Sequence, residues 1–370
     1  MENLFAKLLQ NIESGKISRR QLMQSAALAT GSALVAKSLS AAFAQGGRRT
    51  FPVTTINHLS FNVPDYVKTR DWYVEVLGMQ VRWDDGQKCE VVFGSMPEPN
   101  GMYINPIPPR PGQKTTLNHF AFGVPTPYLM ENFAAMKAEL ERRHLPDVMP
   151  NVNLLHDGPV GFRNKDAAGF TLNAWVPIRS DEMFPGAGGV PCDVKDKVNF
   201  TGLEDPARCK KAYEDGVKMA SMAPKPSGKG FKALYFSHIV LSVAPADYDK
   251  EKEFYTGMLG MKVIYEDLKG TPPQIMLRFG KNTLYLRANG EPGQPPFCNQ
   301  YGFVVENYKQ DAAEAKLKAL GLDPKPDSKL GWYVTDPNGF RVEICGPGLP
   351  EHMAKDCHGF STGCPGGEKG

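Results

Sequence analysis

The chain has 370 residues, which is too many for one small domain and suits two. Hydrophobic residues make up 41% of the sequence, enough to build packed cores, and the formal net charge is only +3. The sequence has no basic stripe with interleaved aromatic residues, so it argues against a nucleic-acid-binding protein. Seven cysteines leave at least one thiol unpaired within the chain, and the sequence does not fix which of them pair.

The N-terminal segment has the pattern of an export signal. Ser18 to Met23 (SRRQLM) is a twin-arginine sequence, a weakly apolar run extends from Ser25 to Ala42, and Ala42-Phe43-Ala44 offers a cleavage site. The apolar run is too short and too polar for a stable membrane span. We therefore expect residues 1–44 to be a twin-arginine signal peptide and the mature protein to be periplasmic or secreted.

Four later segments open with the same short strand pattern. Each has an apolar residue at every second position, and each is followed by a helical, charge-bearing stretch. At the same place in the pattern the four segments carry His58, His119, His238 and Gln300. The spacing repeats as well (119 − 58 = 61 and 300 − 238 = 62). A repeat of this kind predicts two tandem modules, each made of two similar halves.

The alternation gives each of these strands two different faces. Side chains alternate across a strand, so the apolar residues form one face, and the His or Gln stands with small or polar residues on the other. We expect the helix that follows each strand to cover the apolar face. The opposite face is predicted to line a cavity, with the His or Gln at its mouth.

A second repeated element follows the first strand of each module. Asp71 to Met79 (DWYVEVLGM) matches Glu253 to Met261 (EFYTGMLGM), and each match predicts a helix that ends at a left-handed glycine, Gly78 or Gly260. About three further strands follow each helix. The expected fold is therefore α+β, with each module built from two βαβββ units whose mixed sheets curl around a cavity.

The module boundaries follow from changes in composition. We expect the first module over residues 51–178 and the second over residues 233–348. Residues 179–232 are rich in Gly, Pro and Lys and are predicted to be a linker with a short helix. Residues 349–370 contain too few apolar residues for a core and are predicted to be a flexible tail.

Three features together resemble the vicinal oxygen chelate superfamily, which includes glyoxalases, bleomycin-resistance proteins and extradiol dioxygenases. These features are the His-bearing first strands, the two Leu-Gly-Met helix ends, and the run from Asp336 to Glu343 (DPNGFRVE). The resemblance covers both modules. It implies sheets that curl around a metal-and-substrate cavity, with metal ligands on the first strand of each half-module and on closing strands.

Carried onto the second module, the resemblance implies a divalent metal ion (Fe, Mn, Zn or Ni) bound by His238, Gln300 and Glu343. Glu343 would also act as a catalytic base when it is displaced from the metal. This ligand set departs from the two histidines and one carboxylate of the dioxygenases, but glutamine occurs at this place among glyoxalase-like members. This difference argues against dioxygenase activity more strongly than it argues against metal binding.

In the first module the resemblance implies His58 and His119 as metal ligands, but Asn173 stands where the second module has Glu343. Two imidazoles without an anionic ligand bind a hard divalent cation less well. Three side chains are candidates for substrate contacts: Asn173, Tyr285 and Tyr333. For the two tyrosines, packing is the alternative. For Glu343 the alternative is an ion pair with an arginine and no metal.

These residues support two main hypotheses. The first is an exported metal-dependent enzyme, a dioxygenase or a glyoxalase-like lyase or isomerase, that acts on a small oxygen-rich or aromatic molecule. The second is a metal-free protein of the resistance type that binds and sequesters a small molecule. A structural scaffold without either activity is a third class. The sequence leaves open whether the modules pair within one chain or between the two chains of a homodimer.

Overall fold

The computed structural model describes residues 53–94, 100–107, 115–123, 149–153, 158–168, 171–175, 193–194 and 206–355. All of these belong to one compact unit that comprises residues 50–370. The predicted signal peptide, most of the linker and the end of the predicted tail lie outside the described residues, so those predictions stay predictions. Within the described residues, no helix combines the length and the apolar character needed to cross a membrane.

The first sheet has the strand order β2-β3-β4-β1-β5-β8-β7-β6-β9. Its elements are β1 (Thr55–Val63), α4 (Tyr66–Leu77), β2 (Gln80–Asp84), β3 (Cys89–Phe93), β4 (Asn100–Pro106), β5 (Thr116–Gly123), β6 (Met149–Asn153), β7 (Gly158–Lys165), β8 (Thr171–Trp175) and β9 (Asp193–Val194). β1 pairs in parallel with β4 and antiparallel with β5, and β5 pairs in parallel with β8.

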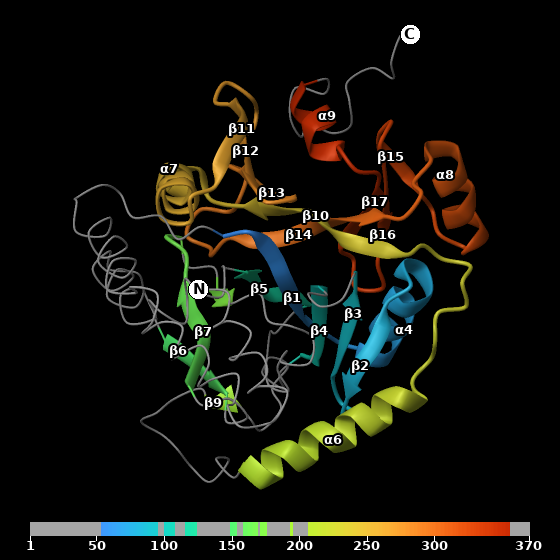
Figure 1. Cartoon of the computed structure of the whole chain (residues 1–370). Helices are drawn as coiled ribbons and strands as arrows, with labels where there is room; N and C mark the ends of the chain where they lie inside the picture. The colour runs from blue at the N-terminus through green and yellow to red at the C-terminus, as the bar shows by residue number, and fades with distance from the viewer. Residues whose placement is uncertain are drawn as a thin grey trace, which may run out of the picture. The chain divides into compact units, whose positions relative to one another are not determined.

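The second sheet repeats this plan in the order β11-β12-β13-β10-β14-β17-β16-β15 (Figure 1). Its elements are β10 (Ala233–Ser242), η1 (Pro245–Asp247), α7 (Tyr248–Glu253), η2 (Phe254–Met258), β11 (Lys262–Asp267), β12 (Gln274–Phe279), β13 (Asn282–Arg287), β14 (Phe297–Val305), α8 (Gln310–Ala319), β15 (Lys325–Ser328), β16 (Gly331–Thr335), β17 (Arg341–Cys345) and α9 (Leu349–Lys355). The mixed α+β fold predicted from the repeat is confirmed.

Two glycines end the repeated helical segments as predicted. Gly78 and Gly260 both have φ of +65°, a left-handed conformation that only glycine adopts at little cost. A Cβ on Gly78 would also lie 2.5 Å from the Phe231 carbonyl oxygen, so the backbone could not approach as it does. The shared sequence Leu-Gly-Met therefore marks the same local structure in both halves of the chain.

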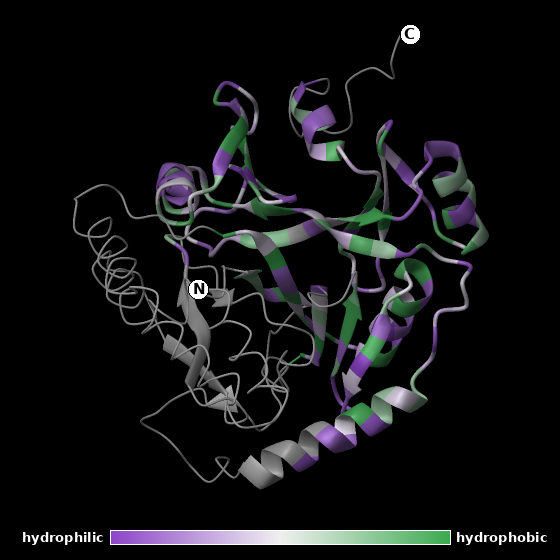
Figure 2. Cartoon of the chain, in the orientation of Figure 1, coloured by the Kyte–Doolittle hydropathy of each residue, from purple (hydrophilic) through white to green (hydrophobic). Residues whose placement is uncertain are grey.

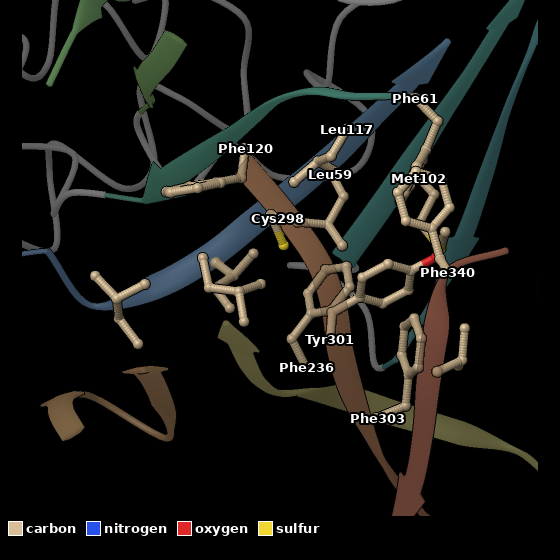
Figure 3. Close-up of a cluster of buried hydrophobic side chains, with 14 of the residues drawn as sticks. Leu59, Phe61, Met102, Leu117, Phe120, Phe236, Cys298, Tyr301, Phe303 and Phe340 are labelled. Carbon is tan, nitrogen blue, oxygen red and sulfur yellow. The ribbon is translucent and has the colours of Figure 1, made fainter. Parts of the chain in front are cut away.

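The apolar faces of the two sheets share one core, which the sequence did not predict. Phe93 of the first sheet lies 4.9 Å from Phe236 and 5.2 Å from Phe303 of the second, measured between ring centroids. Phe61 lies 5.4 Å from Tyr301 (Figure 3). The helices supply only part of the expected cover, because each sheet also covers the other. The ribbon of α7 is mostly hydrophilic (Figure 2), but its Tyr248 belongs to this core and its Glu251 is buried.

Reciprocal hydrogen bonds also join the two halves. The Tyr73 hydroxyl of α4 donates to Asp336 in the β16–β17 turn at 2.9 Å, and the Tyr255 hydroxyl of η2 donates to Asp166 after β7, also at 2.9 Å. Tyr73 and Tyr255 are equivalent positions of the repeat, and so are the two aspartates. Each half thus holds the other through the same pair of residue types.

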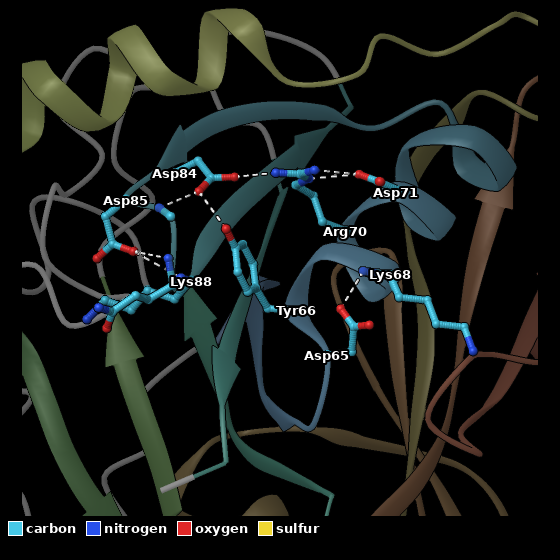
Figure 4. A network of polar contacts seen from close by, with 10 residues as sticks. Asp65, Tyr66, Lys68, Arg70, Asp71, Asp84, Asp85 and Lys88 are labelled. Atoms are coloured by element: carbon cyan, nitrogen blue, oxygen red, sulfur yellow. Dashed lines mark hydrogen bonds and ion pairs between the residues drawn. The ribbon is translucent and has the colours of Figure 1, made fainter.

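Local polar contacts fix α4 and cover the edge of the first sheet. Asp65 caps the helix by accepting from the Lys68 amide at 2.9 Å, and Arg70 bridges Asp71 at 2.8 Å and Asp84 at 2.6 Å (Figure 4). The linker contributes α6 (Pro206–Met222), which packs on β2. α6 falls within the residues that the sequence predicts to be a linker.

Candidate functional site

The strand registers place the predicted ligands at matching positions of the two sheets. His58 on β1 pairs with Ala121 on β5, which pairs with Asn173 on β8. In the second sheet His238 on β10 pairs with Gly302 on β14, which pairs with Glu343 on β17. Residues paired in this way point to the same side of a sheet. The equivalence of Asn173 and Glu343 inferred from sequence therefore holds in the structure; the Asn173 side chain lies outside the described part.

The second-sheet site is defined by His238, Gln300 and Glu343. It is a buried cluster of three different side-chain types: an imidazole, an amide and a carboxyl group. His238 Nε2 lies 3.4 Å from Glu343 Oε2, and both side chains are 0% exposed. Gln300, two residues before Gly302 on the same strand, is 3% exposed. Because side chains two apart along a strand share a face, all three lie on the face opposite the shared core.

Two glycines make room for this cluster. A Cβ on Gly302 would lie 2.4 Å from His238 Cε1, and a Cβ on Gly331 of β16 would lie 2.1 Å from Glu343 Oε1. Real Cβ contacts do not reach such distances, so a side chain at either position would displace a candidate ligand. The role of these two glycines depends on cross-strand neighbours, so the sequence pattern along one strand does not reveal it.

Burial and neighbouring charges set the protonation of the cluster. Burial lowers the pKa of His238 to about 3, with Arg341 and Arg287 acting in the same direction, so the imidazole is neutral at physiological pH. Burial raises the pKa of Glu343, and the nearby Asp327 carboxylate raises it further. Asp327 is itself buried and accepts a hydrogen bond from Arg341.

The cluster fits a divalent cation. The carboxyl group of Glu343 is buried and is contacted by the side chains of Gln300, Asp327 and His238. A neutral imidazole, an amide oxygen and a carboxylate form an N/O ligand set that suits a first-row divalent metal. No group of three His, Cys, Asp or Glu side chains gathers among the described residues, so the third donor here is the Gln300 amide.

Both tyrosines predicted as substrate contacts border this cluster. Tyr285 of β13 lies edge-on to His238, with 5.0 Å between ring centroids, and burial raises the pKa of its hydroxyl well above the usual range. Tyr333 of β16 pairs with Glu343, and its ring lies 3.5 Å from the Arg341 guanidinium carbon. Tyr285 also packs in an apolar cluster with α9, so packing accounts for part of its position.

The first-sheet site, defined by His58 and His119, brings two imidazoles together. Their Nε2 atoms lie 3.2 Å apart, and both side chains are buried. His58 Nδ1 lies 2.8 Å from the side-chain oxygen of Asn57, and His119 Nδ1 lies 2.7 Å from that of Asn118. An amide oxygen only accepts, so each Nδ1 carries the proton and each Nε2 presents a lone pair. Such an outer hydrogen bond is typical of a metal-binding histidine.

The two asparagines are functional neighbours that the strand pattern did not predict, although a signal was present. In each case the residue directly before the histidine makes the Nδ1 contact; at His238 this place is taken by Ser237, whose Oγ lies 3.2 Å from Nδ1. The repeated Asn-His pair was visible in the sequence. Its meaning required the side-chain geometry, because neighbouring strand residues normally point to opposite faces.

The first sheet also contains a buried carboxyl group that was not predicted from the sequence. Glu90 of β3 is buried, burial raises its pKa, and Arg82 lies 3.6 Å away. Glu90 pairs with Tyr103 of β4, whose ring lies 4.7 Å edge-on from that of His58. The equivalent pair in the second sheet is Met276 and Tyr285. The two sites therefore place their acidic groups on different strands.

Residues 55–154 match the model of the Glyoxalase/Bleomycin resistance protein/Dioxygenase superfamily. The chain has the fold of that superfamily. It superposes on the Mn(II)-bound glyoxalase from Novosphingobium aromaticivorans with a TM-score of 0.54, 16% identity, and coverage of 80% of this chain and 83% of that one. For the 2,3-dioxygenase LapB from Pseudomonas sp. KL28 the values are 0.54, 14%, 80% and 93%. No curated protein sequence matches.

Proposed function

We propose that this protein is a metal-dependent enzyme of the vicinal oxygen chelate class that acts on a small oxygen-rich or aromatic molecule. The observation that carries the proposal is the buried approach of His238 Nε2 to Glu343 Oε2 beside Gln300. The fold likeness to a Mn(II)-bound glyoxalase and to a 2,3-dioxygenase supports it. The substrate and the choice between dioxygenase and glyoxalase-like chemistry are parts of the proposal.

In this proposal His238, Gln300 and Glu343 hold the cation, which would polarise two neighbouring oxygens of the substrate. His238 is suited to the task because its neutral imidazole needs no deprotonation. Glu343 has a raised pKa, so its carboxylate is a stronger base than an exposed one and can accept a proton from the substrate. Full burial of both side chains excludes water and strengthens their electrostatic interactions.

The first-sheet site supports a second location for the cation. Two imidazoles with converging Nε2 lone pairs and Asn-bound Nδ1 atoms suit Zn or Ni better than a hard cation. A metal-free binding protein is the rival function, and Asn173 and Gln300 favour it because each replaces a stronger ligand. A metal at the second-sheet site, a metal at the first-sheet site and a metal-free binding protein predict different amounts of bound metal in the wild type and its variants.

Elemental analysis of purified protein tests these alternatives. We expect a stoichiometric divalent cation in the wild type, and in Glu343→Ala an affinity reduced by roughly 100-fold or more. Glu306→Ala is the matched control, since it removes an exposed carboxylate just beyond β14 that pairs with Lys232. Metal lost only in His58→Ala would move the site to the first sheet. Negligible metal in every variant would overturn the enzyme proposal.

A second measurement separates the two reaction types. A dioxygenase consumes dioxygen in proportion to substrate, whereas a glyoxalase-like lyase or isomerase does not. An oxygen electrode with a panel of catechols, compared with 2-oxoaldehyde adducts of thiols followed by absorbance, would assign the class. Loss of either signal in Glu343→Ala but not in Glu306→Ala would tie it to the second-sheet site.

We also propose that residues 1–44 direct twin-arginine export to the periplasm or the exterior, on the basis of the Arg19-Arg20 pair and the apolar run that follows. Fractionation of cells that express the wild type or Arg19→Lys/Arg20→Lys tests this. Retention of the double variant inside the cell is expected, and equal export of both would contradict it. The homodimer left open by the sequence is tested by light scattering of the exported protein.

A further inference from the structure

The short helix α9 covers the face of the second sheet that carries His238 and Glu343. Its Leu349 and Met353 are 0% exposed. They belong to an apolar cluster whose other buried members are Val240, Met276, Tyr285, Val304 and Cys345. Val240 and Cys345 each lie two residues along the strand from a member of the second-sheet site, so the cluster is on the same face as that site. α9 therefore packs beside the site and outside the core that the two sheets share.

An ion pair holds α9 close to His238. The Arg278 guanidinium of β12 donates to Glu351 of α9 at 2.5 Å. Arg278 pairs with Thr283 of β13, which pairs with His238 of β10, so these three positions form a row on one face of the sheet. The ring of Tyr285, a member of the apolar cluster, lies 5.0 Å from that of His238. In Figure 1 the helix lies between the β11–β12 hairpin and β15.

The second-sheet site is closed in this arrangement. His238 and Glu343 are 0% exposed, so a small molecule reaches them only if part of the protein moves. The strands that carry the two residues are held in the sheet by ladder hydrogen bonds. α9 pairs with no strand, and its ion pair is easily broken, because the Glu351 side chain is 52% exposed. Of the elements around the site, α9 therefore costs least to displace.

The backbone directly before α9 is suited to act as a hinge. The Gly346 amide donates to the Leu330 carbonyl oxygen at 2.9 Å, which fixes the end of β17. Gly348, two residues later, has φ of +85°, and a Cβ placed on it would meet no atom within 4 Å. Glycine adopts such a conformation at little cost and has the most backbone freedom. The chain can therefore rotate at Gly348 while the sheet stays in place.

We propose that α9 is the gate of the second-sheet site: the helix swings out about Gly348 to admit a small molecule and then closes again on the apolar cluster. This gating goes beyond the proposed function, since it requires neither a bound metal nor a particular reaction. Cys345 is a natural reporter of the open state, because its buried thiol belongs to the cluster under α9. Cys298 is also buried and free, but it belongs to the shared core.

The test labels the folded, chelator-treated protein with N-ethylmaleimide and reads each cysteine by peptide mass spectrometry. We expect Cys345 to react at least about 10-fold faster than Cys298, because opening of α9 exposes it without unfolding the core. Met353→Ala removes buried contacts of the gate and should speed Cys345 by roughly 30-fold or more, with Cys298 unchanged. Met102→Ala is the matched control, since Met102 is equally buried but lies in the shared core. It should speed Cys298 and leave Cys345 unchanged.

Modification of histidines by diethyl pyrocarbonate connects the gate with the site. In Met353→Ala we expect the rate at His238 to rise in proportion to the rate at Cys345. The rate at His58, which is buried in the first sheet, should stay at its wild-type value. A faster reaction of Cys345 with no change at His238 would show that α9 moves without opening the site, and would overturn the proposal.

Equal labelling of Cys345 and Cys298, both in the wild type and in Met353→Ala, would also overturn it, because only global unfolding would then expose Cys345. If circular dichroism shows that Met353→Ala does not fold, Glu351→Gln decides. It removes only the exposed ion pair and should speed Cys345 about threefold, and an unchanged rate would contradict the gate. The proposed function fails separately, through the absence of bound metal, which these labelling rates do not depend on.

Discussion

The two sheets of this protein place chemically different side chains in one register. Where the first sheet has His58, Ala121 and Asn173, the second has His238, Gly302 and Glu343. The first-sheet site has two convergent imidazoles and no carboxylate at the closing strand. The second-sheet site has the carboxylate and one imidazole. The duplicated scaffold thus carries two imidazoles in one sheet, and one imidazole with a carboxyl group in the other.

The contacts that join the two halves differ in the same way. Thr69 and Glu251 occupy equivalent places of the repeat, but Thr69 contacts Asn338, whereas Glu251 contacts Asp166, the equivalent of Asp336. The first pair is neutral. The second brings two carboxyl groups together in a buried place, beside the Tyr255 hydroxyl that donates to Asp166. The two junctions should therefore respond differently to pH.

The largest expected effect is on the pH dependence of stability between pH 5 and 8. Burial, and then Asp166, raise the pKa of Glu251 to about 10 in the folded state from an ordinary value of 4.5; the nearby Lys250 and the Ala168 amide oppose this. The neutral form is favoured by folding, so this stabilisation is complete below the unfolded pKa and is lost as pH rises. The loss approaches about 1.4 kcal/mol per pH unit. Urea unfolding of the wild type from pH 5 to 8 should show this slope.

Glu251→Gln removes the titrating group and should flatten the slope. Thr69→Val at the equivalent junction is the matched control, because it changes stability without changing the pH dependence. An identical slope in Glu251→Gln and the wild type would show that Glu251 is ionised in the folded protein, contrary to its burial.

The next prediction completes the ligand set of the first sheet. Asn173→Glu adds a carboxylate at the register position of Glu343. A charge gained in a semi-buried site should raise the affinity of the first-sheet site for Zn by roughly 100-fold, as measured by competition with a chelating dye. Asn173→Gln adds length without charge and is the control. Equal affinities in the two variants would show that the closing strand does not reach the imidazole pair.

A smaller effect is expected from filling the space beside His238. Gly302→Ala places a methyl group 2.4 Å from the His238 ring in the observed geometry and should destabilise the fold by about 2 kcal/mol. The first sheet already has Ala121 at this place, so Ala121→Gly should cost only about 1 kcal/mol. Urea unfolding at pH 6 measures both. A Gly302→Ala protein as stable as the wild type would indicate that His238 can leave its position freely.

The parts that could be predicted from the sequence are those encoded by local periodicity. Alternation along the strands identified the face that carries His238 and Glu343, and the Leu-Gly-Met pattern located Gly78 and Gly260. The shared core between the sheets was not predictable in this way, because an apolar face does not specify what covers it. The role of Asp327 was not predictable for the same reason. It depends on Glu343, which is 16 residues away in the sequence (343 − 327 = 16).

The smallest effect is expected from exchanging one neutral donor for another. Gln300→His gives the second sheet the histidine that the first has at His119, but it adds no charge. Zn prefers imidazole to an amide oxygen, so its affinity for the second-sheet site should rise about fivefold, while that of Mn should change little. Competition with a chelating dye in the wild type, Gln300→His and Gln300→Glu separates donor type from charge, since only the last adds a carboxylate. If the Zn affinity rises in Gln300→Glu but not in Gln300→His, charge alone limits the metal affinity of the second-sheet site. The difference in metal affinity between the two sheets would then come from Asn173 and Glu343 alone.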